Sequence, residues 1–188
     1  LPALTSNRLW QAGGQSLAIA LAAGSLATLL GAALLLTSRH LRVRDRKRRA
    51  AALWEASGSM ILMIPAVVLS TGLFIMFMPF TDVFSLGPWL VVLVNALMAL
   101  PYVLRTLNAP MQLVVRQYDR LADSLGVRGL HRLRLVEWPL LRRPLALAMA
   151  LSMILSLGDL GAIAMFGSQT LTTLPWLLYQ QLGSYRLT

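Results

Sequence analysis

Four long apolar runs limit what this chain can fold into more than any other feature of the sequence. Residues 16–37, 57–80 and 86–104 contain no charged side chain, and residues 145–166 contain a single one. A helix needs about 20 predominantly apolar residues to cross the hydrocarbon core of a bilayer, and each run comes close to that length. Their length and number argue against buried helices of a soluble protein. The sequence therefore predicts an all-α, polytopic membrane helix bundle.

The distribution of charge supports this fold and predicts its orientation. The chain has a formal net charge of +10, which could indicate a nucleic-acid partner. However, the basic residues gather in two blocks beside the apolar runs, at residues 39–49 and 105–143. Loops rich in Lys and Arg stay on the cytoplasmic side of a membrane. We therefore expect both blocks to lie on the cytoplasmic side. We also expect contact with membrane lipid and no nucleic-acid partner. The N-terminus, the turn at Asp82 and the C-terminal segment are expected on the other side.

The residues available for chemistry are few. There is no cysteine, and the two histidines, His40 and His131, both lie in basic segments, so we expect no metal and no cofactor. A membrane-embedded enzyme would need paired acids or a nucleophile with its base inside the runs. Asp159 is the one charged residue in a run. The sequence therefore disfavours an enzyme, and a membrane scaffold without a transport role stays open as an alternative.

A polar stretch at residues 118–139 separates the third run from the fourth. Its first half is predicted to form a short helix, since Leu121 and Leu125 are four apart and share one face. Gly126 is placed to end that helix, because glycine adopts the left-handed conformation of a helix cap without steric cost. A second short helix is expected from about residue 130 to 136, with Pro139 in the first turn of the next long helix.

The spacing within this stretch resembles the cytoplasmic signature of permease subunits of bacterial ABC importers. That signature reads Glu-Ala-Ala, three residues, Gly, nine residues, and then Ile-x-Leu-Pro. Gly126 and Pro139 stand at the glycine and proline positions, and Val136 replaces the isoleucine conservatively. The chain departs from the signature elsewhere, at Arg120, Leu121 and Trp138. Because the glutamate is absent, a salt bridge at that position is not expected here.

The resemblance implies a fold of the type I ABC importer permease kind. Residues 1–188 would form a single, partial permease domain that lacks its final span, with a cytoplasmic coupling loop at about residues 108–143. This loop would dock on a separate ATPase subunit, where ATP is hydrolysed, and the chain indeed contains no phosphate-binding loop motif. The expected contact residues are Tyr118, Leu121, Ala122, Ser124, Leu125, Gly126, Val127 and Pro139.

Within this family, several stretches resemble the C-terminal half of the thiamine importers, among them VNALMALPYVLRTL, SLGDLGAIAMFG and TLPWLLYQQLGSYR. The resemblance implies import of thiamine and its phosphates across the bacterial inner membrane by alternating access. It also implies a periplasmic solute-binding protein and a second permease half, expected in the same polypeptide. Relatives that move ferric iron, sulfate or polyamines share the signature, so these solutes stay open as alternatives.

The sequence also predicts structural or functional roles for several further residues. Asn95 lies inside the third run and should bond to another helix or face a water-filled path. Asp159 is either a ligand or counter-ion on the solute path, or a protonated or helix-bonded residue near the far membrane face that holds helices together. The second role is favoured. Pro65 should kink or loosen the helix of the second run. Residues 167–188 are expected to hold a helix that lies at the membrane interface. Small residues of the first run, Gly24 and Gly31 among them, should allow close helix approach.

Overall fold

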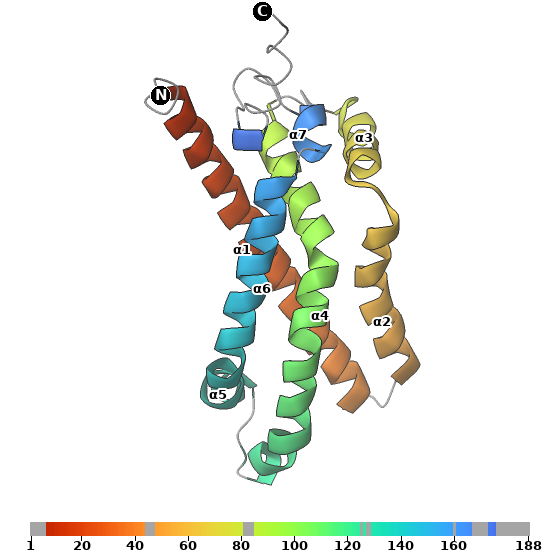
Figure 1. Ribbon diagram of the computed structural model, residues 1–188. Coiled ribbons are helices and arrows are strands. Elements are labelled where there is room, and N and C mark those ends of the chain that lie inside the picture. The colour runs from red at the N-terminus through yellow and green to blue at the C-terminus, as the bar shows by residue number, and fades with distance from the viewer. Residues whose placement is uncertain are drawn as a thin grey trace, which may run out of the picture.

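The computed structural model describes residues 7–43, 48–80, 85–124, 126, 129–159, 161–166 and 173–175, and within these ranges it contains helices and no strand (Figure 1). The elements are α1 (Asn7–Val43), α2 (Arg48–Met60), the short 3-10 helix η2 (Ile61–Met63), α3 (Ala66–Phe77), α4 (Gly87–Ser124), α5 (Gly129–Arg132), the π-helix η3 (Leu133–Glu137), α6 (Trp138–Gly158) and α7 (Gly161–Phe166).

The predicted membrane spans correspond to these helices. Within the described residues, three stretches are long and apolar enough to cross a membrane: Leu9–Arg39, Gly87–Val114 and Leu133–Gly158. The second predicted run forms a bent pair, Ala52–Met63 and Ala66–Phe77, which would be a fourth span if the pair crosses as one. The all-α membrane bundle expected from the sequence is thus confirmed.

Helix α4 forms the centre of the bundle, between α1, α2 and α6 (Figure 1). The apolar part of α4 is 67% buried, compared with 39% for α1 and 22% for the stretch that contains α6. Its inward side chains are mainly Val, Ala and Leu, such as Val94, Ala99 and Leu107. Because lipid tails are as apolar as these side chains, the bundle is stabilised by close packing and not by exclusion of water.

The bundle has two ends that differ in composition. The C-terminal ends of α1 and α4 lie at the same end as α5, and α3 and α7 lie at the opposite end (Figure 1). We call the first the loop end and the second the α7 end. The described parts of both basic blocks therefore meet at the loop end, as the charge distribution predicted, and this end is the expected cytoplasmic one.

Small residues let α1 approach its neighbours closely, as predicted. At Gly24 an added Cβ would lie 2.8 Å from Met153 Cγ on α6. At Gly31 it would overlap Val103 Cγ1 on α4 and lie 3.2 Å from Val103 Cβ. Valine is stiff at χ1, so Val103 has little freedom to move away.

We therefore expect Gly31→Ala to destabilise the protein by about 1–3 kcal/mol through overpacking, seen as a lower midpoint of thermal unfolding in detergent. Gly14→Ala is the matched control, because Gly14 lies on the same helix and a Cβ added there would have no neighbour within 4 Å among the described residues. Alanine is a better helix former than glycine, so the control should be neutral or stabilising. Equal midpoints for the two variants would contradict close contact at Gly31.

The prediction of a separate short helix at the start of the polar stretch was wrong. Helix α4 runs without interruption from the third apolar run to Ser124, through Pro101 and Pro110. The second short helix is not separate either, because α5, η3 and α6 follow one another directly from Gly129. On each side of the loop, no residue between the loop and the neighbouring apolar run ends the helix. The third and fourth runs are therefore helically continuous with the residues that lead to the loop.

The predicted break at Pro65 is confirmed. Pro65 has an extended backbone, with φ −60° and ψ 142°, and stands immediately before α3. The two helical arms around it make an angle of 98°. A proline lacks the N–H that would continue the helix and clashes with the preceding turn, which explains why the second run bends here.

The fourth run is not one helix, contrary to the prediction of a span over residues 145–166. The spanning stretch begins earlier, at Leu133, and α6 ends at Gly158. Asp159 has an extended backbone, with φ −82° and ψ 120°, and α7 begins after it. The Asp159 carboxylate accepts a hydrogen bond from the backbone N–H of Gly161 at 2.8 Å. A side chain that bonds its own backbone in this way favours a turn over a continuous helix.

Some predictions fall on residues outside the described ranges. These are the turn at Asp82, the middle of the first basic block, and most of the predicted interfacial helix at residues 167–188. Within that last segment Thr173 is buried, and the backbone N–H of Leu174 donates a hydrogen bond to Ser16 Oγ at 2.8 Å. This bond ties Leu174 to α1.

Candidate functional site

The loop end carries the residues predicted to contact a partner. Gly126 has φ +67°, the left-handed conformation expected from the sequence, and it follows the last residue of α4, Ser124, by two positions. Ser124 is exposed and Tyr118 is half-buried. Pro139 is exposed in the first turn of α6, as predicted.

The other predicted contact residues are described less fully. Leu121 and Ala122 lie in the last turns of α4, but their side chains are outside the described part of the chain. Leu125 and Val127 lie outside the described residues altogether. The structure thus places the helix end and the glycine of this loop, while the identity of the contact residues stays a prediction.

A buried charge cluster lies where the loop joins α6, and sequence reasoning missed it. Glu137 is 4% exposed, and its Oε1 accepts a hydrogen bond from Arg39 of α1. The same oxygen lies 3.3 Å from Nε of Arg132 on α5. A signal was present, because Glu137 is the one acidic residue between Asp123 and Asp159, within a strongly basic stretch.

The electrostatics of this cluster are unfavourable without the carboxylate. Burial first, and then the neighbouring Arg39 cation, lower the pKa of the Arg132 guanidinium below its ordinary value, while Glu137 acts in the opposite direction. Arginine nevertheless stays protonated in proteins, so two cations share one carboxylate. Because Arg39 belongs to α1 and Glu137 belongs to η3, the cluster links the first span to the loop.

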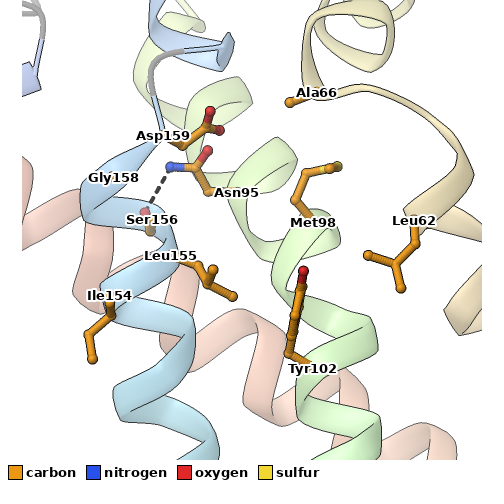
Figure 2. A pocket seen from close by; sticks show the side chains of 10 residues that line it. All are labelled: Leu62, Ala66, Asn95, Met98, Tyr102, Ile154, Leu155, Ser156, Gly158 and Asp159. Carbon is orange, nitrogen blue, oxygen red and sulfur yellow. Dashed lines mark hydrogen bonds between the residues drawn. The ribbon is translucent and has the colours of Figure 1, made fainter.

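A pocket of about 360 Å³ lies nearer the α7 end, between η2 and α3, α4, and the end of α6 (Figure 2). It brings together Asn95 and Asp159, which the sequence had singled out separately. Its other lining residues are Leu62, Ala66, Met98, Tyr102, Ile154, Leu155, Ser156 and Gly158.

Asn95 connects two spans at this pocket. It is 2% exposed, and its Nδ2 donates a hydrogen bond to Ser156 Oγ of α6 at 2.8 Å (Figure 2). Asn95 therefore does bond to another helix, one of the two outcomes expected from its position. Its carboxamide oxygen, in contrast, is buried and has no hydrogen-bond partner in the part of the chain that the structure describes. Ser156 and Tyr102 are pocket residues that sequence reasoning did not identify.

Within the described part of the chain, no group of three or more His, Cys, Asp or Glu side chains is arranged to hold a metal ion. Among the described residues, the main polar features are the loop at Gly126 with the Glu137 charge cluster at one end, and a mainly apolar pocket with a carboxylate and a carboxamide toward the other.

Comparison with known proteins identifies relatives over almost the whole chain. Residues 29–183 match the family described as "Binding-protein-dependent transport system inner membrane component". The chain is 43% identical over 183 residues to the thiamine transport system permease protein ThiP of Brucella abortus (strain 2308), which covers 97% of this chain. It is 46% identical to ThiP of Escherichia coli K12 over 95% of the chain, and 45% identical to ThiP of Haemophilus influenzae over 96%.

The chain spans only about a third of the length of these relatives, 33% for the Brucella and Escherichia proteins and 34% for the Haemophilus protein. The part that it matches is the C-terminal third. The helical membrane bundle and the turn at Gly126 agree with this match. The family match over residues 29–183 shows that this chain belongs to the binding-protein-dependent transport system inner membrane components, the permeases of bacterial ABC importers.

Proposed function

We propose that this chain is part of the permease of an ATP-driven importer that moves thiamine and its phosphates across the inner membrane by alternating access. The observation that carries this proposal is the identity of 43–46% to thiamine transport permeases over nearly the whole chain. The chain itself contains no phosphate-binding loop, so ATP would be hydrolysed on a separate nucleotide-binding subunit. A periplasmic binding protein would deliver the solute, and the rest of the permease would complete the path.

The loop end is the surface proposed to meet the ATPase subunit. It presents the exposed end of α4 at Ser124, the turn at Gly126 and the exposed Pro139. It also lies at the end where the described basic residues gather, and the distribution of Lys and Arg predicts that this end is cytoplasmic. Because α4 and α6 both leave this end as spans, a displacement of the loop would act on both helices at once.

The decisive experiment is reconstitution of the full-length permease with its ATPase subunit and binding protein in proteoliposomes. We expect loaded thiamine-binding protein to stimulate ATP hydrolysis and to drive accumulation of labelled thiamine. Ferric iron, sulfate and spermidine are tested separately as alternative solutes, each with its own binding protein. Stimulation by one of these and not by thiamine would reassign the solute, and purification without any ATPase subunit would favour a scaffold.

A further inference from the structure

We propose that the pocket between α3, α4 and the end of α6 binds the positively charged part of a small heteroaromatic solute. In this assignment Asp159 supplies the counter-charge and the Asn95 carboxamide oxygen accepts an N–H from the same solute. The inference rests on the proposed function, since it assigns a solute contact within the proposed importer.

The first observation is an acceptor without a donor. In the orientation that the structure has, the Nδ2 of Asn95 donates a hydrogen bond to Ser156 Oγ at 2.8 Å. In this orientation Oδ1 is buried and has no hydrogen-bond partner among the described residues. Buried polar atoms in folded proteins are nearly always paired, and an exception calls for an explanation. Figure 2 shows this oxygen directed toward the carboxylate of Asp159.

The second observation is that the neighbouring group is also an acceptor. The Asp159 carboxylate accepts the Gly161 N–H at 2.8 Å through Oδ1, and an ionised carboxylate has several further lone pairs to offer. The described residues that line the pocket include no Lys, Arg or His. Two acceptors therefore face each other with no cation among the lining side chains. A ligand that carries both positive charge and an N–H donor satisfies both groups.

The remaining walls suit a flat organic cation better than a hydrated metal ion. They are mainly apolar, with Met98, Leu62 and Leu155 among them. Tyr102 is 42% exposed and lines the same pocket, and the face of an aromatic ring attracts a cation. The volume of about 360 Å³ lies toward the small end of the range of roughly 300–1,000 Å³ found for ligand sites. Thiamine has the required chemistry, with a cationic thiazolium and an aminopyrimidine N–H.

The test separates the charge of Asp159 from its structural bond. Asp159→Asn removes the charge, but its carboxamide oxygen can still accept the Gly161 N–H, because asparagine caps helices as well as aspartate does. Uptake is measured in proteoliposomes that hold the full-length permease, its ATPase and its binding protein. The two probes are thiamine and deazathiamine, in which an uncharged thiophene replaces the thiazolium. The binding protein is the same for every variant, so its own preference cancels when variants are compared.

We expect the preference for thiamine over deazathiamine to fall about tenfold or more in Asp159→Asn, as for loss of a close charge pair. Asp159→Ser, which keeps a capping oxygen and also lacks the charge, should show the same fall and guards against an assembly defect peculiar to asparagine. Ser152→Ala is the matched control. Ser152 is buried one turn before Ser156, bonds to the carbonyl of Ala148 and does not line the pocket, so its variant should keep the wild-type preference.

Two results would overturn the inference, and they differ from each other. If Asp159→Asn and Asp159→Ser transport thiamine with the wild-type preference, Asp159 does not contact the cation and serves only to begin α7. If the wild-type assembly does not transport thiamine at all, the proposed function fails and the solute contact fails with it.

Discussion

Replacement of Glu137 by alanine is expected to destabilise the protein by about 3–5 kcal/mol, the usual result of removing one partner from a buried ion pair. Glu137 is 4% exposed, and the side chains of Arg39 and Arg132 are each only 15% exposed. Without the carboxylate, two cations from different elements would face each other at the loop end. The measurement is the midpoint of thermal unfolding of the full-length permease in detergent.

The control for Glu137→Ala is Arg105→Ala, because Arg105 is exposed on α4 and its removal should change stability by no more than about 0.5 kcal/mol. The double variant Glu137→Ala with Arg39→Ala should recover part of the loss, since it removes one of the two opposed cations. If Glu137→Ala unfolds at the same temperature as the control, the cluster does not hold the loop to α1.

Replacement of Gly126 by valine is expected to uncouple ATP hydrolysis from uptake while the protein still inserts and folds. A residue with a Cβ loses about 1–2 kcal/mol in the left-handed conformation, and β-branched residues tolerate it least. Among the described residues, a Cβ added at Gly126 would have no packing neighbour within 4 Å, so the expected cost arises from the backbone. A cost of this size changes the ratio of two loop conformations about 5- to 30-fold.

The measurement for Gly126→Val uses the absence of cysteine from this chain. In a full-length permease cleared of other cysteines, Ser124→Cys reports contact with a cysteine placed on the ATPase subunit, and Gly126→Val should weaken that cross-link together with thiamine uptake. Met78→Cys, exposed near the α7 end, should not cross-link. Gly126→Asn is the matched control, because asparagine accepts the left-handed conformation. Normal uptake and cross-linking in Gly126→Val would rule out a docking role for this turn.

The parts of the fold that were predictable depend on local chemistry. Apolar length fixes the spans, and the restricted backbone of Pro65 fixes the bend before α3. The freedom of glycine at φ +67° explains the turn at Gly126, and Pro139 falls in the first turn of α6. Each of these features follows from a few neighbouring residues, so no knowledge of the packing was needed.

The features that were missed depend on residues far apart in the sequence or on competition between local signals. The contact of Glu137 with Arg39 joins positions 98 residues apart. The sequence did mark Asp159, but it could not show that the Gly161 N–H would satisfy the carboxylate and divide the fourth run into α6 and α7. Likewise, Asn95 was expected to have a partner, but only the packing of α4 against α6 identifies that partner as Ser156.

The continuity of α4 has a mechanical consequence. Asn95 at the pocket and Ser124 at the loop belong to one unbroken helix, and the 29 positions between them correspond to about 44 Å at a rise of 1.5 Å per residue. A continuous helix can carry movement between the two sites without a chain of side-chain contacts, although Pro101 and Pro110 each remove one backbone hydrogen bond from it. A tilt of this segment by about 5° would displace one of its ends by roughly 4 Å relative to the other. A displacement that the proposed ATPase subunit causes at the loop end would thus be transmitted along α4 to the proposed solute pocket, as along a lever.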